Sequence, residues 1–166
     1  MTIFASRIPT PVDDMVAAVD GDGALVLLEF ADGRRPEDLV SGLGDVIWSD
    51  APLAEIHRQL DEYFAGQRRE FDVAIRPAGS DFQHRVWQVV QGIPYGETKS
   101  YGEVAAQLDR AGASRAVGRA NATNPVCLLT PCHRVIGKDG SLTGFGGGIE
   151  TKRWLLEHES AQRRLV

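Results

Sequence analysis

The sequence is poor in cysteine. Its 166 residues contain two, Cys127 and Cys132, and none precedes Cys127. Zinc sites built from thiolates usually carry Cys-x-x-Cys pairs, and the sequence has no such pair. The short spacing, with prolines nearby, disfavours a disulfide between the two. We therefore expect no metal site and no cofactor, and the simplest interpretation of each thiol is a small buried side chain.

Long apolar runs are also missing. No stretch approaches the roughly 20 residues needed to span a bilayer. The N-terminal stretch MTIFASRIPTPVDD has no basic start followed by an apolar core, unlike a secretory signal. An apolar content of 43% and a charged content of 25% are typical of soluble globular proteins. We expect a cytoplasmic, monomeric protein that does not contact a membrane.

Acidic residues are absent from residues 110–138, which hold five basic residues. Residues 1–79 carry 15 acidic and 7 basic side chains, a net charge of −8. Residues 80–166 carry 8 acidic and 11 basic side chains, a net charge of +3. This asymmetry favours two modules, the second of which faces an anionic partner such as nucleic acid. A solvated basic surface is the alternative.

Residues 1–79 are predicted to form a small α+β module. Three stretches are typical of strands or strand edges: residues 1–10, 24–30 and 44–50. Residues 51–66 are predicted to be a helix that ends at Gly66. The apolar face of this helix comprises Leu53, Ile56, Leu60 and Phe64. Residues 71–75 alternate as a strand or an extended linker, and residues 77–79 mark the module boundary.

Residues 80–166 are predicted to form a mostly helical domain. A first helix begins at Ser80 or Asp81 and ends near Gly92. A capping box at Ser100-x-x-Glu103 begins a second helix. A short turn with glycine separates it from a third helix, capped near Ser114. This order is that of a helix-turn-helix, although any pair of packed helices gives the same pattern.

The C-terminal part is predicted to contain three further segments. Residues 125–136 are interrupted by two prolines and are expected to be extended and largely buried. Residues 137–148 form a glycine-rich loop, and residues 149–164 form a last helix. The predicted core face of that helix comprises Trp154, Leu155 and Leu156.

Cys132 is the better placed of the two thiols for nucleophilic chemistry because His133 follows it. Adjacent residues in an extended segment point to opposite sides, so we expect His133 to act through a water or a turned backbone. A histidine base needs an orienting carboxylate, and Glu159 shares a face with Leu156 on the last helix. Chance adjacency in a packed core is the alternative. Cys127 has no base beside it and is predicted to be a core residue.

The motif PCHRV, with the upstream stretches SRAVGRANATNP and FQHRVWQVVQGIPYGETKSYGEVA, resembles one family of proteins. This family is the 6-O-alkylguanine-DNA alkyltransferases, or methylated-DNA–protein-cysteine methyltransferases. The resemblance is strong over residues 80–160 and weak before them. It implies an α+β protein with a ribonuclease-H-like N-terminal module, an antiparallel sheet plus a helix. The C-terminal domain is then mostly helical and contains the helix-turn-helix.

The resemblance also implies DNA repair by direct reversal. The damaged guanine rotates out of the duplex, and the Cys132 thiolate takes the alkyl group from its 6-oxygen. The 4-oxygen of thymine is a second candidate atom. No step regenerates the cysteine, so each molecule reacts once. The implied partner is double-stranded DNA that carries alkylated bases.

The resemblance assigns catalytic roles around Cys132. His133 takes the thiol proton through a water, and Glu159 orients and polarises His133. Tyr101 supplies a hydroxyl to the leaving guanine, and Asn124 ties the Cys132 segment to the helix before it. The implied substrate-binding residues are Tyr101, Val135, Phe145, Gly146 and Trp87. Many members have tyrosine in place of Phe145, and a core aromatic is the alternative for Trp87.

The resemblance places the second helix of the helix-turn-helix in the minor groove, where small side chains permit close approach. Arg115 fills the hole left by the extruded base. Arg119, where a glycine is commoner in the family, meets phosphate. The implied DNA-binding residues are Arg115, Ala116, Gly118, Arg119, Ala120, Lys138 and Gly102. An exposed helix with two solvated arginines is the alternative.

Two other functions stay open from the sequence. The first is a non-catalytic protein that binds alkylated bases without repairing them. Relatives of that kind have tryptophan where this chain has Cys132. The second is a Cys-His-Glu thiol hydrolase that acts on small molecules. The predicted helix-turn-helix and the basic stretch favour DNA over a hydrolase.

Overall fold

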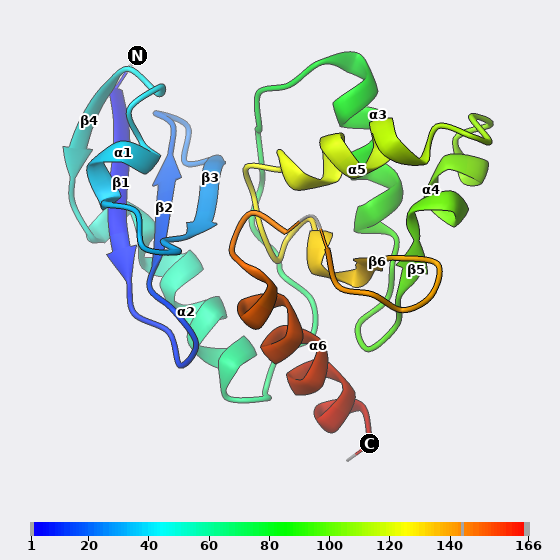
Figure 1. Ribbon diagram of the computed structural model, residues 1–166. Coiled ribbons are helices and arrows are strands. Elements are labelled where there is room, and N and C mark those ends of the chain that lie inside the picture. Colours follow the sequence, from blue (N-terminus) through cyan, green and yellow to red (C-terminus); the bar gives the residue numbers. More distant parts are fainter. Residues whose placement is uncertain (1, 144, 165–166) are drawn as a thin grey trace. The chain divides into compact units, whose positions relative to one another are not determined.

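The computed structural model of the protein describes residues 2–143 and 145–164 (Figure 1). The chain divides into two compact units, Met1–Ala78 and Gly79–Val166. Among the described residues, no helix is both long and apolar enough to cross a membrane.

The first unit is built on a four-stranded sheet with the order β3-β2-β1-β4. The strands are β1 (Thr2–Ile8), β2 (Met15–Val19), β3 (Leu25–Phe30) and β4 (Asp45–Trp48). β1 pairs with β2 and β2 with β3 in antiparallel fashion, but β4 runs parallel to β1. The expected antiparallel sheet is therefore mixed. The connection from β3 to β4 is long enough to return the chain to the end of the sheet at which β1 begins.

One strand of this unit, β2, was not predicted from the sequence. Its five residues are all buried, so they show no alternation of polar and apolar side chains. Residues 71–75, predicted as a strand or an extended linker, form no regular strand, which leaves the linker of these two alternatives. Of these residues, Ile75 alone pairs with a strand residue, through an isolated bridge to Leu25.

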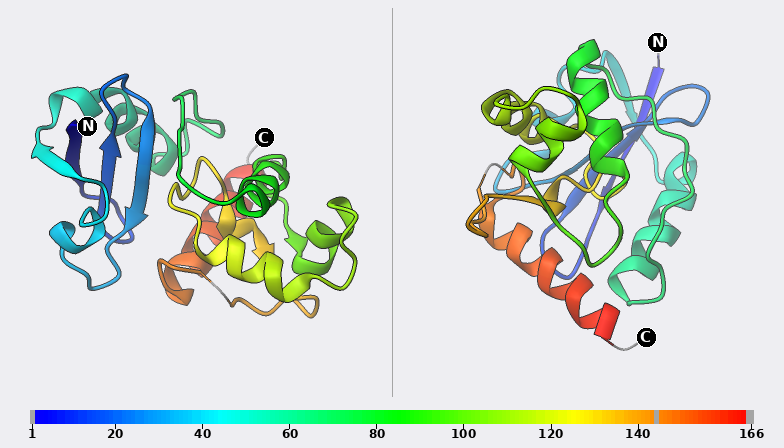
Figure 2. Two further views of the ribbon diagram at one scale, coloured as in Figure 1. Left: turned by 90° about the horizontal axis from the view of Figure 1, so that it is seen from above. Right: turned by 90° about the vertical axis from the view of Figure 1, so that its right-hand side faces the viewer.

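Two helices cover the faces of the sheet, α1 (Pro36–Leu39) and α2 (Ala54–Phe64) (Figure 2). α2 follows a 3-10 turn, η1 (Ala51–Leu53), and its apolar face is nearly as predicted. The fully buried aromatic side chain at its end is Tyr63, whereas Phe64 is partly exposed. Gly66 ends the helix with a φ of +77°, a left-handed conformation that favours glycine.

The second unit is mostly helical, as predicted. Its helices are α3 (Asp81–Gln91), α4 (Tyr101–Gln107), α5 (Ser114–Ala122) and α6 (Ile149–Arg164). Capping boxes begin α3 at Ser80 and α4 at Ser100. The cap predicted at Ser114 was wrong, because Ala113 is the N-cap and no side chain caps α5. α4 and α5 pack against each other and against α3, as in a helix-turn-helix.

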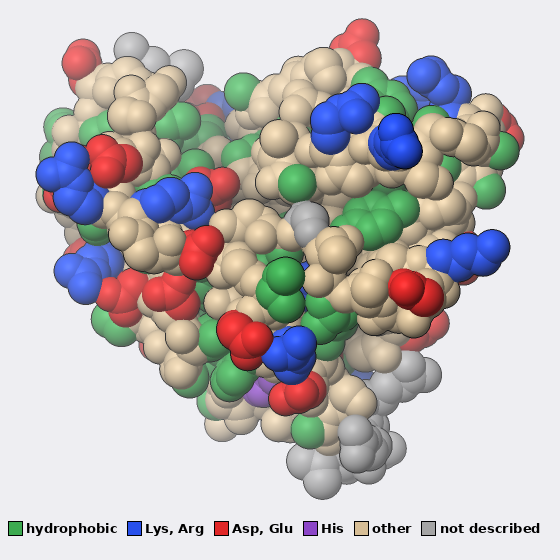
Figure 3. Space-filling model, in the orientation of Figure 1, with side chains coloured by type: hydrophobic (Ala, Val, Ile, Leu, Met, Phe, Trp, Pro, Cys, Tyr) green, Lys and Arg blue, Asp and Glu red, His purple; other side chains and the backbone are tan. Residues whose placement is uncertain are grey.

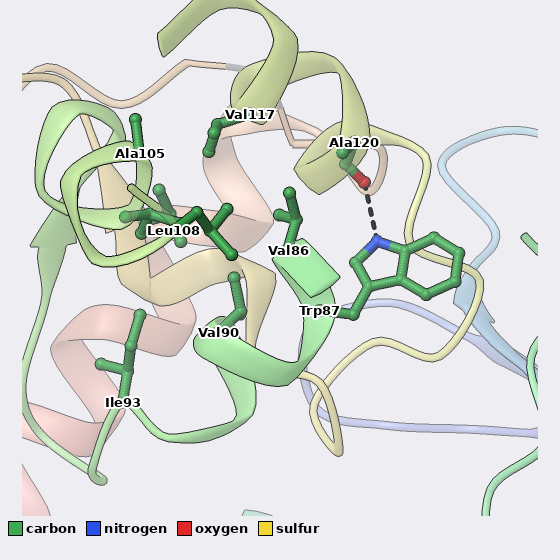
Figure 4. Packing of buried hydrophobic residues seen from close by; sticks show 10 residues of the cluster. Val86, Trp87, Val90, Ile93, Ala105, Leu108, Val117 and Ala120 are labelled. Carbon is green, nitrogen blue, oxygen red and sulfur yellow. Dashed lines mark hydrogen bonds between the residues drawn. The ribbon is translucent and has the colours of Figure 1, made fainter. Parts of the chain in front are cut away.

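The core of the second unit contains two of the predicted site residues (Figure 4). Trp87 is 2% exposed, and its indole N–H donates to the Ala120 carbonyl at 2.8 Å. Ala120 is itself buried in the same cluster. Trp87 is therefore a core residue rather than a pocket edge, whereas Ala120 packs in the core and also lines a small surface hollow with Ala116 and Arg119. The cause is their spacing on α3 and α5, which puts both on the packed faces of these helices.

The segment between α5 and α6 carries a 3-10 turn, η2 (Cys132–Arg134), and a short strand, β6 (Val135–Ile136), which pairs with β5 (Lys99–Ser100) in parallel. α6 has the predicted bounds but a different buried face. Leu155 is fully buried, whereas Trp154 and Leu156 are partly exposed. Among the side chains of α6 that the structure describes, the other buried ones are Thr151, Lys152 and Glu159.

Candidate active site

The segment before Cys132 is held by Asn124. Its amide group donates to the carbonyls of Thr130 at 2.9 Å and Val126 at 3.2 Å, and its oxygen accepts from the Val126 N–H at 3.0 Å. These bonds join residues within the loop 124–130. They do not link the Cys132 segment to α5, as was predicted for Asn124. That link comes from Asn121 on α5, whose amide donates to the Cys132 carbonyl at 3.1 Å. Asn121 is not among the residues predicted from the sequence.

Cys132 and His133 lie in η2, not in an extended segment. A 3-10 turn has three residues per turn, so successive side chains do not point to opposite sides. The exposed fraction is 3% for Cys132 and zero for His133. Both functional groups are therefore shielded from bulk solvent in this state of the protein.

Glu159 on α6 meets both residues that follow Cys132. Its Oε2 lies 2.8 Å from His133 Nε2. The Arg134 guanidinium donates to Oε1 from Nε at 2.8 Å and to Oε2 from Nη2 at 3.0 Å. Arg134 also donates from Nη1 to the Ile93 carbonyl at 2.7 Å. The predicted contact of Glu159 with His133 is present, and Arg134 is a further member that the sequence analysis did not assign to the site.

The charges of this cluster fix the tautomer of His133. Burial lowers the pKa of His133, and the opposing effect of Glu159 does not restore it, so the ring is neutral. Burial alone would raise the pKa of Glu159, but His133 and Arg134 lower it well below its usual range. An ionised carboxylate only accepts, so Nε2 carries the ring proton and Nδ1 keeps a lone pair. Among the described residues Nδ1 has no hydrogen-bond partner, and this nitrogen is free to act as a base.

The Cys132 thiol is surrounded by groups that favour its ionised form. Its pKa is lowered by a hydrogen bond from Cys127; burial opposes this, while Asn124 and the charge of Lys152 lower it further. Cys127 is buried, as predicted, but it is also a neighbour of the reactive thiol. A thiolate stabilised in this way is a better populated nucleophile at neutral pH.

Lys152 is a buried cation of α6 that the sequence analysis missed. Its Nζ donates to the carbonyls of Val135 at 2.6 Å and Thr143 at 2.8 Å. Burial lowers the pKa of Lys152 to about 8, against the attraction of Cys132. The Val135 carbonyl thus already accepts one side-chain hydrogen bond.

Tyr101 stands at the start of α4, beside an open groove. Its hydroxyl donates to the Thr143 carbonyl at 2.7 Å, and burial raises its pKa, so it is a neutral donor. The groove has a volume of about 620 Å³. It is lined by Tyr101, Ser114, Arg115, Gly118, Arg119, Ala122 and Thr143. Figure 3 shows Lys and Arg side chains over α5, on the same face.

The remaining predicted residues differ in exposure. Five are exposed: Gly102, Arg115, Arg119, Lys138 and Gly146. Ala116 is partly exposed and lines a smaller hollow with Arg119. Phe145 is 9% exposed, and a Cβ at Gly146 would lie 3.4 Å from the Ala122 carbonyl, so the glycine loop approaches α5 closely. Within the described part of the chain, no group of three or more His, Cys, Asp or Glu is arranged to hold a metal ion.

Comparisons with known proteins identify the family of the chain. The family model described as "6-O-methylguanine DNA methyltransferase, DNA binding domain" matches residues 81–161. The model described as the ribonuclease-like domain of the same proteins matches residues 8–77. A methylated-DNA–protein-cysteine methyltransferase of Mycobacterium leprae is 42% identical over 160 residues, which are 96% of this chain and 94% of that protein.

The chain belongs to the 6-O-methylguanine DNA methyltransferase family. The resemblance seen in the sequence and the expected fold class are thereby confirmed. A methyltransferase of this family from Mycobacterium tuberculosis (strain H37Rv) is 58% identical over 104 residues, a segment that spans 63% of this chain and 63% of that relative. A crystal structure of Mycobacterium tuberculosis OGT in complex with DNA matches with a TM-score of 0.86 and 40% identity, over 96% of this chain and 94% of that chain.

The buried Glu159 predicts a large effect on stability. In Glu159→Gln, one amide oxygen cannot serve both His133 and the Arg134 fork, so the buried guanidinium loses its counter-charge. We expect a loss of about 3 kcal/mol in the free energy of unfolding, measured with urea. Glu157→Gln, an exposed position on the same helix, is the matched control and should change little. Equal urea midpoints for the two variants would contradict this account of the cluster.

Proposed function

We propose that this protein repairs alkylated DNA by transferring a methyl or larger alkyl group from the 6-oxygen of guanine to Cys132. The observation that carries the proposal is the Cys132–His133–Glu159 arrangement, in a chain of this family. Glu159 holds His133 as a neutral ring with its lone pair on Nδ1, and Cys132 lies next to it in the chain. This is the arrangement that a thiol needs to lose its proton.

The transfer balances with groups of this chain. The Cys132 proton passes to His133 Nδ1 through a bridging water. The sulfur then attacks the alkyl carbon in line, the S–C bond forms, and the C–O bond breaks with its electron pair moving to the guanine. The guanine anion takes up one proton and His133 gives its extra proton up, so the ring returns to its neutral form. The product is a stable thioether that no residue cleaves, so each molecule acts once.

Tyr101 is the proposed donor to the guanine as this negative charge develops. Its raised pKa keeps the phenol protonated. Because the hydroxyl donates to the Thr143 carbonyl, it must exchange that partner for the base when the guanine enters. Val135, Phe145 and Gly146 are the proposed pocket wall.

The groove beside α5 is the proposed DNA-facing surface. Arg115 and Arg119 are exposed on it, and Gly118 leaves Tyr101 uncovered by a side chain. Ala116, Gly102 and Lys138 are the other proposed contacts. A helix with small residues enters the minor groove closely, and an arginine fills the space of a base rotated out of the stack. The proposed partner is duplex DNA bearing alkylated guanine, and the proposed acting form is a cytoplasmic monomer.

Mass spectrometry tests the transfer directly. After mixing with a duplex that carries one 6-O-methylguanine, we expect each protein molecule to gain one methyl group in exchange for one proton. Fragmentation should place it on Cys132, and Cys132→Ala should gain nothing. Tight binding of the lesion duplex without a mass gain would instead indicate a protein that binds damage without repairing it.

The position of Arg119 in the groove predicts that its removal changes how strongly the affinity for DNA depends on salt concentration. If it meets a phosphate, Arg119→Ala should reduce the slope of log affinity against log salt concentration by about 0.9, with a weaker affinity for all duplexes alike. Arg153→Ala removes an exposed arginine from α6, outside the groove, and is the control. Identical slopes for Arg119→Ala and the unaltered protein would remove Arg119 from the interface.

A further inference from the structure

Asn121 connects α5, the helix of the proposed DNA-facing surface, to the reactive segment. Arg115 and Arg119 of this helix are exposed, whereas Asn121 is 1% exposed. Its Nδ2 donates to the Cys132 carbonyl at 3.1 Å, and the same carbonyl accepts the Val135 N–H. Because a carbonyl oxygen can only accept, the amide nitrogen of Asn121 must face it, and this fixes the direction of the amide oxygen.

Two buried acceptors lie beside the peptide that joins Cys132 and His133. They are Asn121 Oδ1 and His133 Nδ1, and neither has a hydrogen-bond partner among the described residues. The Asn121 amide is planar and its Nδ2 bonds the carbonyl of this peptide, so Oδ1 also lies close to it. The His133 ring is attached at the other end of the same peptide. Its Nε2 faces Glu159, and Nδ1 is the ring nitrogen nearer the backbone.

We propose that Asn121 is a positioning residue for alkyl transfer, whose Oδ1 orients the water that carries the thiol proton from Cys132 to His133 Nδ1. The inference rests on the proposed function of the same site. Two acceptors cannot bond each other, whereas a water has two O–H groups and can donate to both. Its oxygen is then left to accept from the Cys132 thiol. Three partners are typical of a buried water, and buried acceptors are nearly always satisfied in this way when no protein donor reaches them.

The water keeps its bond to Asn121 throughout the proton transfer. Before the transfer, it accepts from the Cys132 thiol and donates to His133 Nδ1 and Asn121 Oδ1. The thiol proton moves to the water oxygen while the water gives the proton on its other side to Nδ1. Afterwards the water donates to the thiolate and to Oδ1, and it accepts from the new Nδ1–H. One O–H group stays on Asn121, so the other is directed at His133 before the transfer begins.

The charged and titratable groups around Cys132 are unchanged by a substitution at Asn121. Besides His133, they are Lys152 and Glu159 of α6, Tyr101 of α4, Arg134 of η2 and Cys127 of the preceding loop. Burial lowers the pKa of Lys152 to about 8, so this lysine titrates within the range of the experiment. Because it does so in every variant, the rates are compared between variants at each pH.

A crystal structure of the unaltered protein tests the geometry. We expect one buried water within about 3.2 Å of both Asn121 Oδ1 and His133 Nδ1. A water on Nδ1 that does not reach Asn121, or a protein group in its place, would overturn the inference. This result does not depend on alkyl transfer, so it is obtained whether or not the proposed function holds.

Single-turnover transfer from the 6-O-methylguanine duplex tests the consequence. Asn121→Leu removes the amide and nearly keeps the volume of the side chain. Gln91→Leu is the matched control, because it removes another helix amide, which donates to the Thr130 hydroxyl of the loop before Cys132 at 3.0 Å. Rates are measured from about pH 5 to about pH 10, and urea unfolding confirms that each variant is folded.

We expect Asn121→Leu to be about tenfold slower than the unaltered protein at the acid end of this range, where the thiol must lose its proton. At the alkaline end, where Cys132 is ionised in every variant, it should be as fast or faster. Gln91→Leu should match the unaltered protein throughout.

Two kinetic results would overturn the inference. The first is superimposable profiles for Asn121→Leu and the unaltered protein. The second is a rate reduced equally at every pH, because that result marks a displaced Cys132 rather than a disturbed proton transfer. If the unaltered protein gains no methyl group, the proposed function fails instead, and the crystal structure still shows whether Asn121 holds the water.

Discussion

The Glu159 carboxylate joins segments that the chain keeps far apart. Glu159 lies on α6 and accepts hydrogen bonds from the Arg134 guanidinium and from His133. Arg134 also donates a hydrogen bond to the carbonyl of Ile93, which follows α3. Burying this charge is costly, and the cost is offset only because every partner is present. The same contacts that hold α6 against the Cys132 segment therefore also orient the histidine, so stability and chemistry share one set of bonds.

The cluster favours a neutral His133 and an ionised Cys132, the two protonation states that the proposed reaction needs. His133 stays neutral because it is buried, whereas Cys132 is drawn toward its thiolate by donors and by Lys152. Lys152 and Tyr101 both donate to the Thr143 carbonyl, which ties the glycine loop to α6 and α4. In the proposed function, a guanine that enters competes with the Tyr101 bond to Thr143, which would couple the groove to the thiol site through one carbonyl.

Local signals in the sequence were sufficient for much of the second unit. A capping box needs only four consecutive residues, which is why the starts of α3 and α4 could be predicted. Glu159 is buried as expected, but it shares the buried face with Leu155, four residues before it, and not with the partly exposed Leu156. What was missed depends on partners distant in the chain: the parallel pairing of β4, the bond from Asn121, and the buried cation Lys152. A lysine in a helix is ordinarily exposed, so nothing local marks it as internal.

The central claim is that Glu159 fixes His133 as a neutral ring with the proton on Nε2 and the lone pair on Nδ1. Nitrogen-15 NMR of histidine-labelled protein measures this directly, with His133→Gln used to assign the signal. The account predicts, at neutral pH, one protonated Nε2 and one unprotonated Nδ1 for His133. A doubly protonated ring, or a proton on Nδ1, would contradict it, because neither leaves a base to receive the thiol proton.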